Sequence, residues 1–114
     1  MLNHSDALDR AFHVLSDPTR RNIVARLAQG PCPVGTLAAP LPMSLPAVLQ
    51  HLRLLEGCGI VRSEKVGRVR TCRLDPGALR SAEAWIAEQR QVWEARLDRL
   101  ERYLDDTAGE NGDG

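Results

Sequence analysis

The run of residues 33–74 constrains the fold most, because its patterns predict two short helices and then two strands with little chain between them. Prolines separate the two helices, and glycines follow the second helix and the first strand. The expected elements cover residues 34–39, 44–57, 60–65 and 69–74. This order is a helix-turn-helix followed by a wing, so we expect a mostly α fold with a two-stranded β wing.

The second of these helices has two faces of different chemistry. Leucines and a valine recur on one face, whereas the other carries short or polar side chains such as Ala47, Gln50 and Arg53. Such a face can approach the major groove of DNA, where glutamine pairs with adenine and arginine with guanine. Ser44 is expected to cap the helix, and Pro46 fits its first turn, where no backbone donor is needed.

The charge of the chain is zero overall but uneven along it. Residues 31–75 carry six basic and three acidic side chains, whereas residues 76–114 carry five basic and nine acidic ones. Because a local positive field matters more for DNA affinity than the total, this distribution favours DNA binding over an ordinary solvated hairpin. The candidate DNA-binding residues are Ser44, Pro46, Ala47, Gln50, His51 and Arg53 in the helix, and Lys65, Arg68 and Arg70 in the hairpin.

Two further helices are expected before this run. The first covers about residues 6–15, and the second begins at Pro18 with Asp17 as its cap. Arg20 and Arg21 lie in the first turn of the second helix, where they could reach a phosphate or remain solvated.

A last helix of close to thirty residues is expected from near Pro76 to about Asp105. Its apolar residues form one stripe, which we expect a second copy of the helix to cover in a dimer. The alternative is that the helix folds back onto the core of its own chain. The expected dimer-interface residues are Leu8, Phe12, Ile86, Trp93, Leu97 and Leu100. A single domain is expected over residues 1–106, followed by a disordered tail over residues 107–114, which is rich in Gly, Asp and Glu.

Composition and motifs exclude several classes of protein. The chain has 114 residues and 26% charged side chains, as expected of one globular domain. No apolar run approaches the ~18 residues of a membrane span, and the first residues lack a signal-peptide pattern, so a cytoplasmic location is expected. The sequence has no phosphate-binding loop or metalloprotease motif, so neither enzyme activity nor a cofactor is expected.

The three cysteines contain no CxxC pair, which argues against a disulfide framework or a structural zinc site. Cys58 follows the second helix of the helix-turn-helix, and Cys72 lies in the second strand. If the two lie close together, they could form a thiol redox switch; the alternative is that both are small packing residues. Cys32 is expected in an exposed loop.

Four short runs of the sequence carry a resemblance to a known family. They read LSDPTRR at residues 15–21, PAVLQHLRLL at 46–55, and GIV at 59–61 with GR at 67–68. Over about residues 6–105 the chain resembles the ArsR-family winged-helix repressors. The resemblance implies a homodimer, joined through its first and last helices, that represses a nearby promoter and releases DNA when an inducer binds.

The departures from the family pattern concern the sensor and part of the DNA-reading helix. The family motif has Gln, Ser and Lys where this chain has Leu45, Leu49 and Gln50. The chain has neither the CxC pair of arsenic sensors nor a histidine after His51. The chain therefore resembles the metal-free branch, and we expect no regulatory metal. The expected partner is double-stranded DNA with an inverted repeat; the alternative is a winged-helix scaffold for protein contacts, which the two leucines favour.

Overall fold

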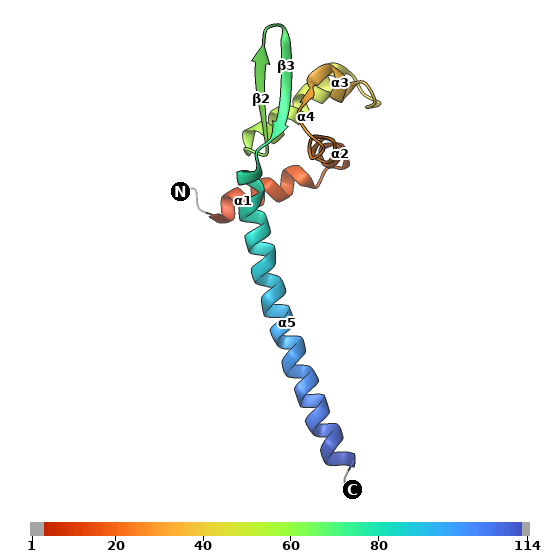
Figure 1. Ribbon diagram of the computed structural model, residues 1–114, viewed down its shortest axis with the longest axis vertical. Helices are drawn as coiled ribbons and strands as arrows, with labels where there is room; N and C mark the ends of the chain where they lie inside the picture. The colour runs from red at the N-terminus through yellow and green to blue at the C-terminus, as the bar shows by residue number, and fades with distance from the viewer. Residues whose placement is uncertain (1–3, 113–114) are drawn as a thin grey trace. The chain divides into compact units, whose positions relative to one another are not determined.

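The computed structural model describes residues 4–112, which contain five helices and three strands (Figure 1). In chain order the elements are α1 (His4–Leu15), α2 (Pro18–Leu27), β1 (Cys32–Pro33), α3 (Val34–Ala38), α4 (Leu45–Gly57), β2 (Val61–Val66), β3 (Val69–Leu74) and α5 (Pro76–Gly112). Contacts group the residues up to Ala82 into one unit and those from Glu83 onward into a second. None of the described helices is both long and apolar enough to cross a membrane.

The two central helices begin at the caps that the sequence predicts. Asp17 accepts a hydrogen bond from the backbone N–H of Arg20 at 3.1 Å, which lowers the pKa of its carboxyl group. The Oγ of Ser44 accepts a hydrogen bond from the backbone N–H of Ala47 at 3.3 Å. Each helix has a proline in its first turn, where the missing N–H has no helical acceptor. Local chemistry therefore determines where α2 and α4 start.

The sheet has three antiparallel strands in the order β1-β3-β2, and β2 and β3 form the hairpin at the top of Figure 1. The hairpin is the predicted wing, and Gly67 enters its two-residue turn with a φ of 64°, the pattern of a type II′ turn. The two-stranded wing is confirmed, and β1 adds a third strand to the sheet, on the other edge of β3, that the sequence patterns did not predict. A two-residue strand is too short for a periodic signal, and its Pro33 is tolerated because the strand lies at the edge.

The core of the first unit combines side chains from α2, α4 and the sheet. Its fully buried members are Ile23, Cys32, Val48, Leu55, Ile60, Val61 and Cys72. From α1, Ala11 and Val14 are buried, whereas Phe12 stays 39% exposed. The helix therefore packs on the core through small side chains and leaves Phe12, an expected dimer-interface residue, accessible.

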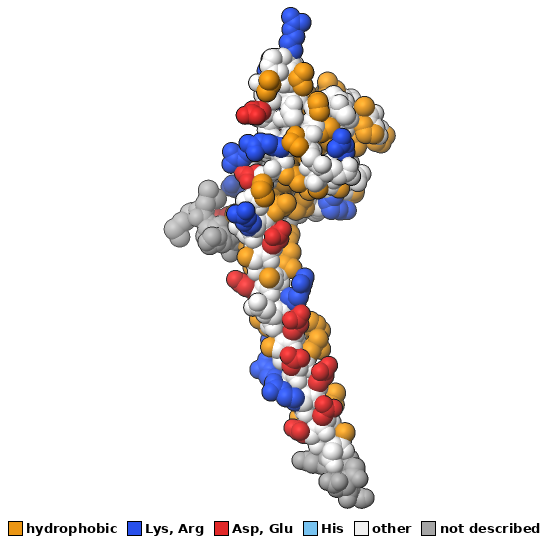
Figure 2. Space-filling view, in the orientation of Figure 1, with side chains coloured by type: hydrophobic (Ala, Val, Ile, Leu, Met, Phe, Trp, Pro, Cys, Tyr) orange, Lys and Arg blue, Asp and Glu red, His pale blue; other side chains and the backbone are white. Residues whose placement is uncertain are grey.

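α5 runs as one helix from Pro76 to Gly112, so the expected tail is helical over residues 107–112 and its last two residues lie outside the described part. No proline follows Pro76, and extending a formed helix adds one hydrogen bond per residue, so low apolar content alone does not stop it. In the second unit the large apolar side chains of this helix are 38–66% exposed and are interspersed with charged ones (Figure 2). They are Trp85, Ile86, Val92, Trp93, Leu97, Leu100, Tyr103 and Leu104.

Candidate nucleic-acid interface

The outer face of α4 is accessible, and its inner face is anchored in the core. Val48, Leu52 and Leu55 are buried, which fixes the rotation of the helix about its axis. The side chains proposed to read DNA lie on the remaining surface: Ser44, Pro46, Gln50 and Arg53 are exposed, and Ala47 and His51 are half-buried. The fold therefore presents these six residues on one element, as a recognition helix requires, and their role in DNA binding stays a prediction.

Two leucines add an apolar component to this face. Leu45, which helical spacing assigns to the buried stripe, is 51% exposed because it lies in the first turn, at the edge of the core. Leu54 is 45% exposed. Sequence periodicity marks α4 as amphipathic but does not show that this apolar surface remains open.

The turn of the hairpin presents positive charge without an internal partner. Lys65 and Arg68 are both exposed, and neither side chain has a hydrogen bond or ion pair within residues 4–112. Figure 2 shows Lys or Arg atoms, in blue, projecting at the tip of the hairpin. Val66 and Val69 on either side of the turn are 70% and 51% exposed. The tip therefore offers free guanidinium and ammonium groups beside apolar side chains.

Arg70, the third basic residue proposed in the hairpin, is engaged within the protein. Its Nε donates to the Oγ of Ser63 at 3.0 Å, and its Nη2 lies 4.0 Å from Oε1 of Glu56. Ser63 in turn donates to the same Glu56 oxygen at 2.7 Å. These contacts tie β2 and β3 to α4, so Arg70 is positioned as a structural link more than as a free phosphate ligand.

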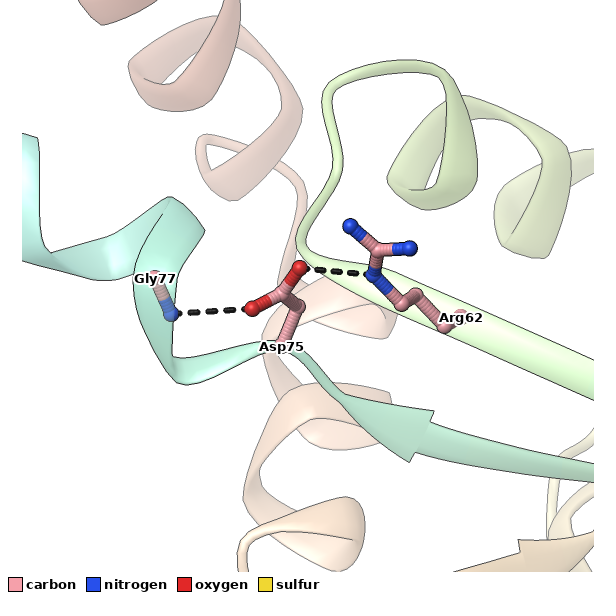
Figure 3. A network of polar contacts seen from close by, with 3 residues as sticks. All are labelled: Arg62, Asp75 and Gly77. Carbon is pink, nitrogen blue, oxygen red and sulfur yellow. Dashed lines mark hydrogen bonds and ion pairs between the residues drawn. The ribbon is translucent and has the colours of Figure 1, made fainter.

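A second polar network joins β2 to the start of α5 (Figure 3). The Nε of Arg62 donates to Oδ2 of Asp75 at 2.6 Å, and the backbone N–H of Gly77 donates to Oδ1 at 2.9 Å. The hydrogen bond from Arg62 is the main cause that lowers the pKa of Asp75, and the bond from Gly77 adds to it. Arg62 is therefore neutralised locally and adds little to the free positive charge of the hairpin.

The arginines at the start of α2 point back toward α1. Arg20 is only 9% exposed; its Nε donates to the carbonyl oxygen of Val14 at 2.6 Å, and its Nη1 lies 3.2 Å from Nδ1 of His51 in α4. Arg21 donates to the carbonyl oxygen of Leu15 at 2.8 Å. Neither of the two sequence alternatives, phosphate contact or free solvation, describes Arg20. Sequence reasoning missed it because its partner His51 lies 31 residues away.

The cysteines are arranged differently from the expected pair. Cys72 lies opposite Cys32 in the register of β3 and β1, and both side chains are fully buried, so the expectation of an exposed Cys32 is wrong. Cys58 is half-buried and donates to the carbonyl oxygen of Leu55. Burial, followed by the charge of Glu56, raises the pKa of Cys72. A buried, protonated thiol is a poor nucleophile, which favours the packing interpretation.

Metal-ligating groups do not converge in the part of the chain that the structure describes. No group of three or more His, Cys, Asp or Glu side chains there could hold a metal ion. Among the described residues, the first unit presents an accessible helix face and a basic hairpin tip, and the second unit presents an apolar stripe on α5.

The chain is similar to known proteins both in sequence and in structure. The sequence model for the arsR family of bacterial regulatory proteins matches residues 17–63. The HTH-type transcriptional regulator Rv2034 of Mycobacterium tuberculosis is 51% identical over 71 residues, which are 62% of this chain and 66% of that protein. A crystal structure of an ArsR family transcriptional regulator superposes with a TM-score of 0.75 at 42% identity and covers 82% of this chain and 97% of its own.

A fourth comparison concerns the fold alone. The homodimeric winged helix-turn-helix DNA-binding domain of a Mycobacterium bovis protein has a TM-score of 0.61 at 24% identity, over 76% of this chain and 82% of that one. The comparisons thus confirm the winged-helix fold, and the long last helix is seen in the structure of this chain. The match spans only 52–66% of the length of the first curated relatives.

Proposed function

Since this chain belongs to the arsR family of bacterial regulatory proteins, we propose that it binds DNA sequence-specifically as a homodimer and regulates transcription as a repressor or autorepressor. The observation that carries the proposal is the surface made by α4 and the hairpin tip. Gln50, Arg53 and Arg68 are exposed there without a partner among the described residues, on elements that the core and the Glu56 contacts hold in place. Such a regulator would act in the cytoplasm, where a bacterium keeps its chromosome.

In this proposal α4 enters the major groove. Gln50 makes paired hydrogen bonds to an adenine, Arg53 contacts a guanine or a phosphate, and the Ala47 methyl group contacts a thymine methyl. Ser44 and Pro46 lie at the amino end of the helix, where free backbone N–H groups favour a phosphate. His51 donates to the DNA backbone at the edge of this face.

The hairpin contributes to the affinity for DNA rather than to sequence specificity. Lys65 and Arg68 contact phosphates or enter the minor groove beside α4, because their charges are not neutralised by any described residue. Arg70 keeps the hairpin against α4 through Ser63 and Glu56. This division of roles predicts different effects for substitutions at positions 68 and 70.

The dimer is proposed from the apolar stripe of α5. Ile86, Trp93, Leu97 and Leu100 are 38–61% exposed, and a stripe of this size is costly to leave in water. A second copy covers it about a twofold axis, with Leu8 and Phe12 of α1 contributing to the interface. Two identical reading heads then require an inverted repeat, with half-sites about one helical turn or a multiple of it apart.

Fluorescence anisotropy with DNA from the protein's own upstream region tests the proposal. We expect the protein to bind one fragment more tightly than a scrambled sequence, with Gln50→Ala reducing that preference at one base pair per half-site. Gln29→Ala, which removes an exposed glutamine in the turn after α2, is the matched control and should bind as the wild type does. Equal affinity of the wild type for all fragments would refute sequence-specific regulation.

The second candidate function is a winged-helix scaffold for protein contacts. The exposure of Leu45 and Leu54 on α4 favours it, because apolar side chains on this face suit a protein partner better than phosphates. Absence of DNA binding even at low salt, in a protein that sediments as a dimer, would support the scaffold over the regulator.

A further inference from the structure

Arg20 is the one buried charged side chain among the residues whose burial the structure describes. A guanidinium group that leaves water is stable only when its N–H groups find acceptors. Here Nε donates to the carbonyl oxygen of Val14 at 2.6 Å, and Nη1 lies 3.2 Å from Nδ1 of His51. Its backbone N–H also donates to the cap residue Asp17. Arg20 thus connects the end of α1 and the start of α2 to the DNA-reading helix α4.

The contact with His51 has a definite proton arrangement. Arginine carries only donors and stays charged, so Nη1 must donate and Nδ1 of the imidazole must accept. A neutral imidazole with a free lone pair on Nδ1 carries its hydrogen on Nε2. Nε2 lies across the ring from the contact with Arg20, and no described residue accepts a hydrogen bond from it. The half-buried His51 therefore keeps one N–H donor available.

We propose that Arg20 is a positioning residue that holds His51 in its Nε2–H form and aims this N–H at a phosphate oxygen of bound DNA. The inference rests on the proposed function, because it gives His51 a role in DNA binding. It adds that the role depends on a side chain that itself never touches DNA. The buried guanidinium fixes both the tautomer and the ring orientation before DNA arrives, so less side-chain freedom is lost on binding.

The tautomer can be measured without DNA, by long-range ¹H–¹⁵N correlation spectra of the ¹⁵N-histidine-labelled full chain. In the wild type we expect the Nε2–H pattern for His51, whereas the exposed His13 should show the averaged pattern of a free imidazole. Arg20→Met keeps much of the side-chain length but has no donor, so it should shift His51 toward that averaged pattern. An Nδ1–H form in the wild type, or an unchanged His51 pattern in Arg20→Met, would overturn the proposal.

DNA affinity tests the second half of the inference. His51→Gln can present an amide N–H near the position of Nε2 and should bind within about twofold of the wild type, whereas His51→Ala should lose about tenfold. Arg20→Met should lose a similar factor, and the double variant Arg20→Met with His51→Ala should lose no more than either alone. Additive losses would mean that Arg20 acts independently of His51 and would overturn the proposal.

One further variant and one comparison of results separate the possible explanations of these experiments. If Arg20→Met does not fold, Arg20→Lys retains one donor at this position and should preserve both the Nε2–H pattern and DNA binding. If the wild type binds no DNA, the proposed function and the phosphate contact of His51 are both overturned. The spectra would still show whether Arg20 determines the tautomer of His51. A wild type whose binding depends on Gln50 but not on His51 would overturn this inference alone.

Discussion

The most quantitative prediction concerns the hairpin, because its arginines at positions 68 and 70 have different surroundings. Arg68 is exposed and has no partner among the described residues, whereas Arg70 already bonds Ser63 and lies 4.0 Å from Glu56. Arg68→Ala should therefore remove one phosphate contact per protomer, and hence two per dimer. Arg70→Ala should remove an internal link and leave the number of phosphate contacts nearly unchanged.

The magnitude follows from counterion release. Each phosphate contact contributes a slope of about −0.9 to log K against log salt concentration, so Arg68→Ala should make the slope shallower by about 1.8. Between about 50 and 200 mM salt, the affinity advantage of the wild type over Arg68→Ala should then shrink about 12-fold. Arg70→Ala should instead keep the wild-type slope and lower the free energy of unfolding by about 1 kcal/mol, the usual net contribution of such a bond.

Anisotropy titrations over this salt range, with a fixed operator fragment, measure the slopes. Arg26→Ala removes an exposed arginine without a described partner on α2 and controls for the general loss of positive charge. Equal slopes for wild type and Arg68→Ala would refute the assignment of the hairpin tip to DNA. An equal change of the salt-dependence slope in Arg68→Ala and Arg70→Ala would refute the argument that the contacts with Glu56 and Ser63 keep Arg70 from binding a phosphate.

Four other predictions concern the helix cap, the dimer, the acid response and the thiols. Ser44→Ala removes the cap of α4 and should lower the free energy of unfolding by about 1 kcal/mol in urea titrations; an unchanged midpoint would contradict the cap. Leu97→Asp places an unpaired charge in the proposed interface, so sedimentation should find a dimeric wild type and a monomeric variant; a monomeric wild type at micromolar concentration would exclude paired half-site reading. Because Arg62 lowers the pKa of Asp75, the carboxylate stabilises the fold above about pH 3.8, and this contribution is lost as the pH falls through the lower folded-state value. Asp75→Asn should therefore flatten the acid side of the stability profile, and an unchanged profile would argue against the Arg62 contact. Because burial raises the pKa of Cys72, diamide should leave the DNA affinity of wild type and Cys72→Ser alike; a loss confined to the wild type would establish a redox switch.

Much of the fold follows from signals that lie within a few residues of one another. Asp17 with Pro18, and Ser44 with Pro46, determine where α2 and α4 begin, because a cap bonds an N–H three residues along the chain. Gly67 determines the hairpin turn, since its positive φ suits a glycine. The apolar spacing of α4 likewise indicates which face is buried and, by exclusion, which face is accessible.

Tertiary structure alone decided the partners of the polar and sulfur-containing side chains. Cys32 lies opposite Cys72 in neighbouring strands of the sheet rather than in a loop. Arg20 is buried against His51 rather than solvated. Arg70 contacts Glu56, although it is exposed like the other two basic residues of the proposed site in the hairpin, Lys65 and Arg68. Each of these contacts joins residues 14 or more positions apart, whose distance depends on how whole elements pack. A periodic pattern specifies which face of an element is apolar, but the partner of one charged or thiol group depends on the other elements packed against that face.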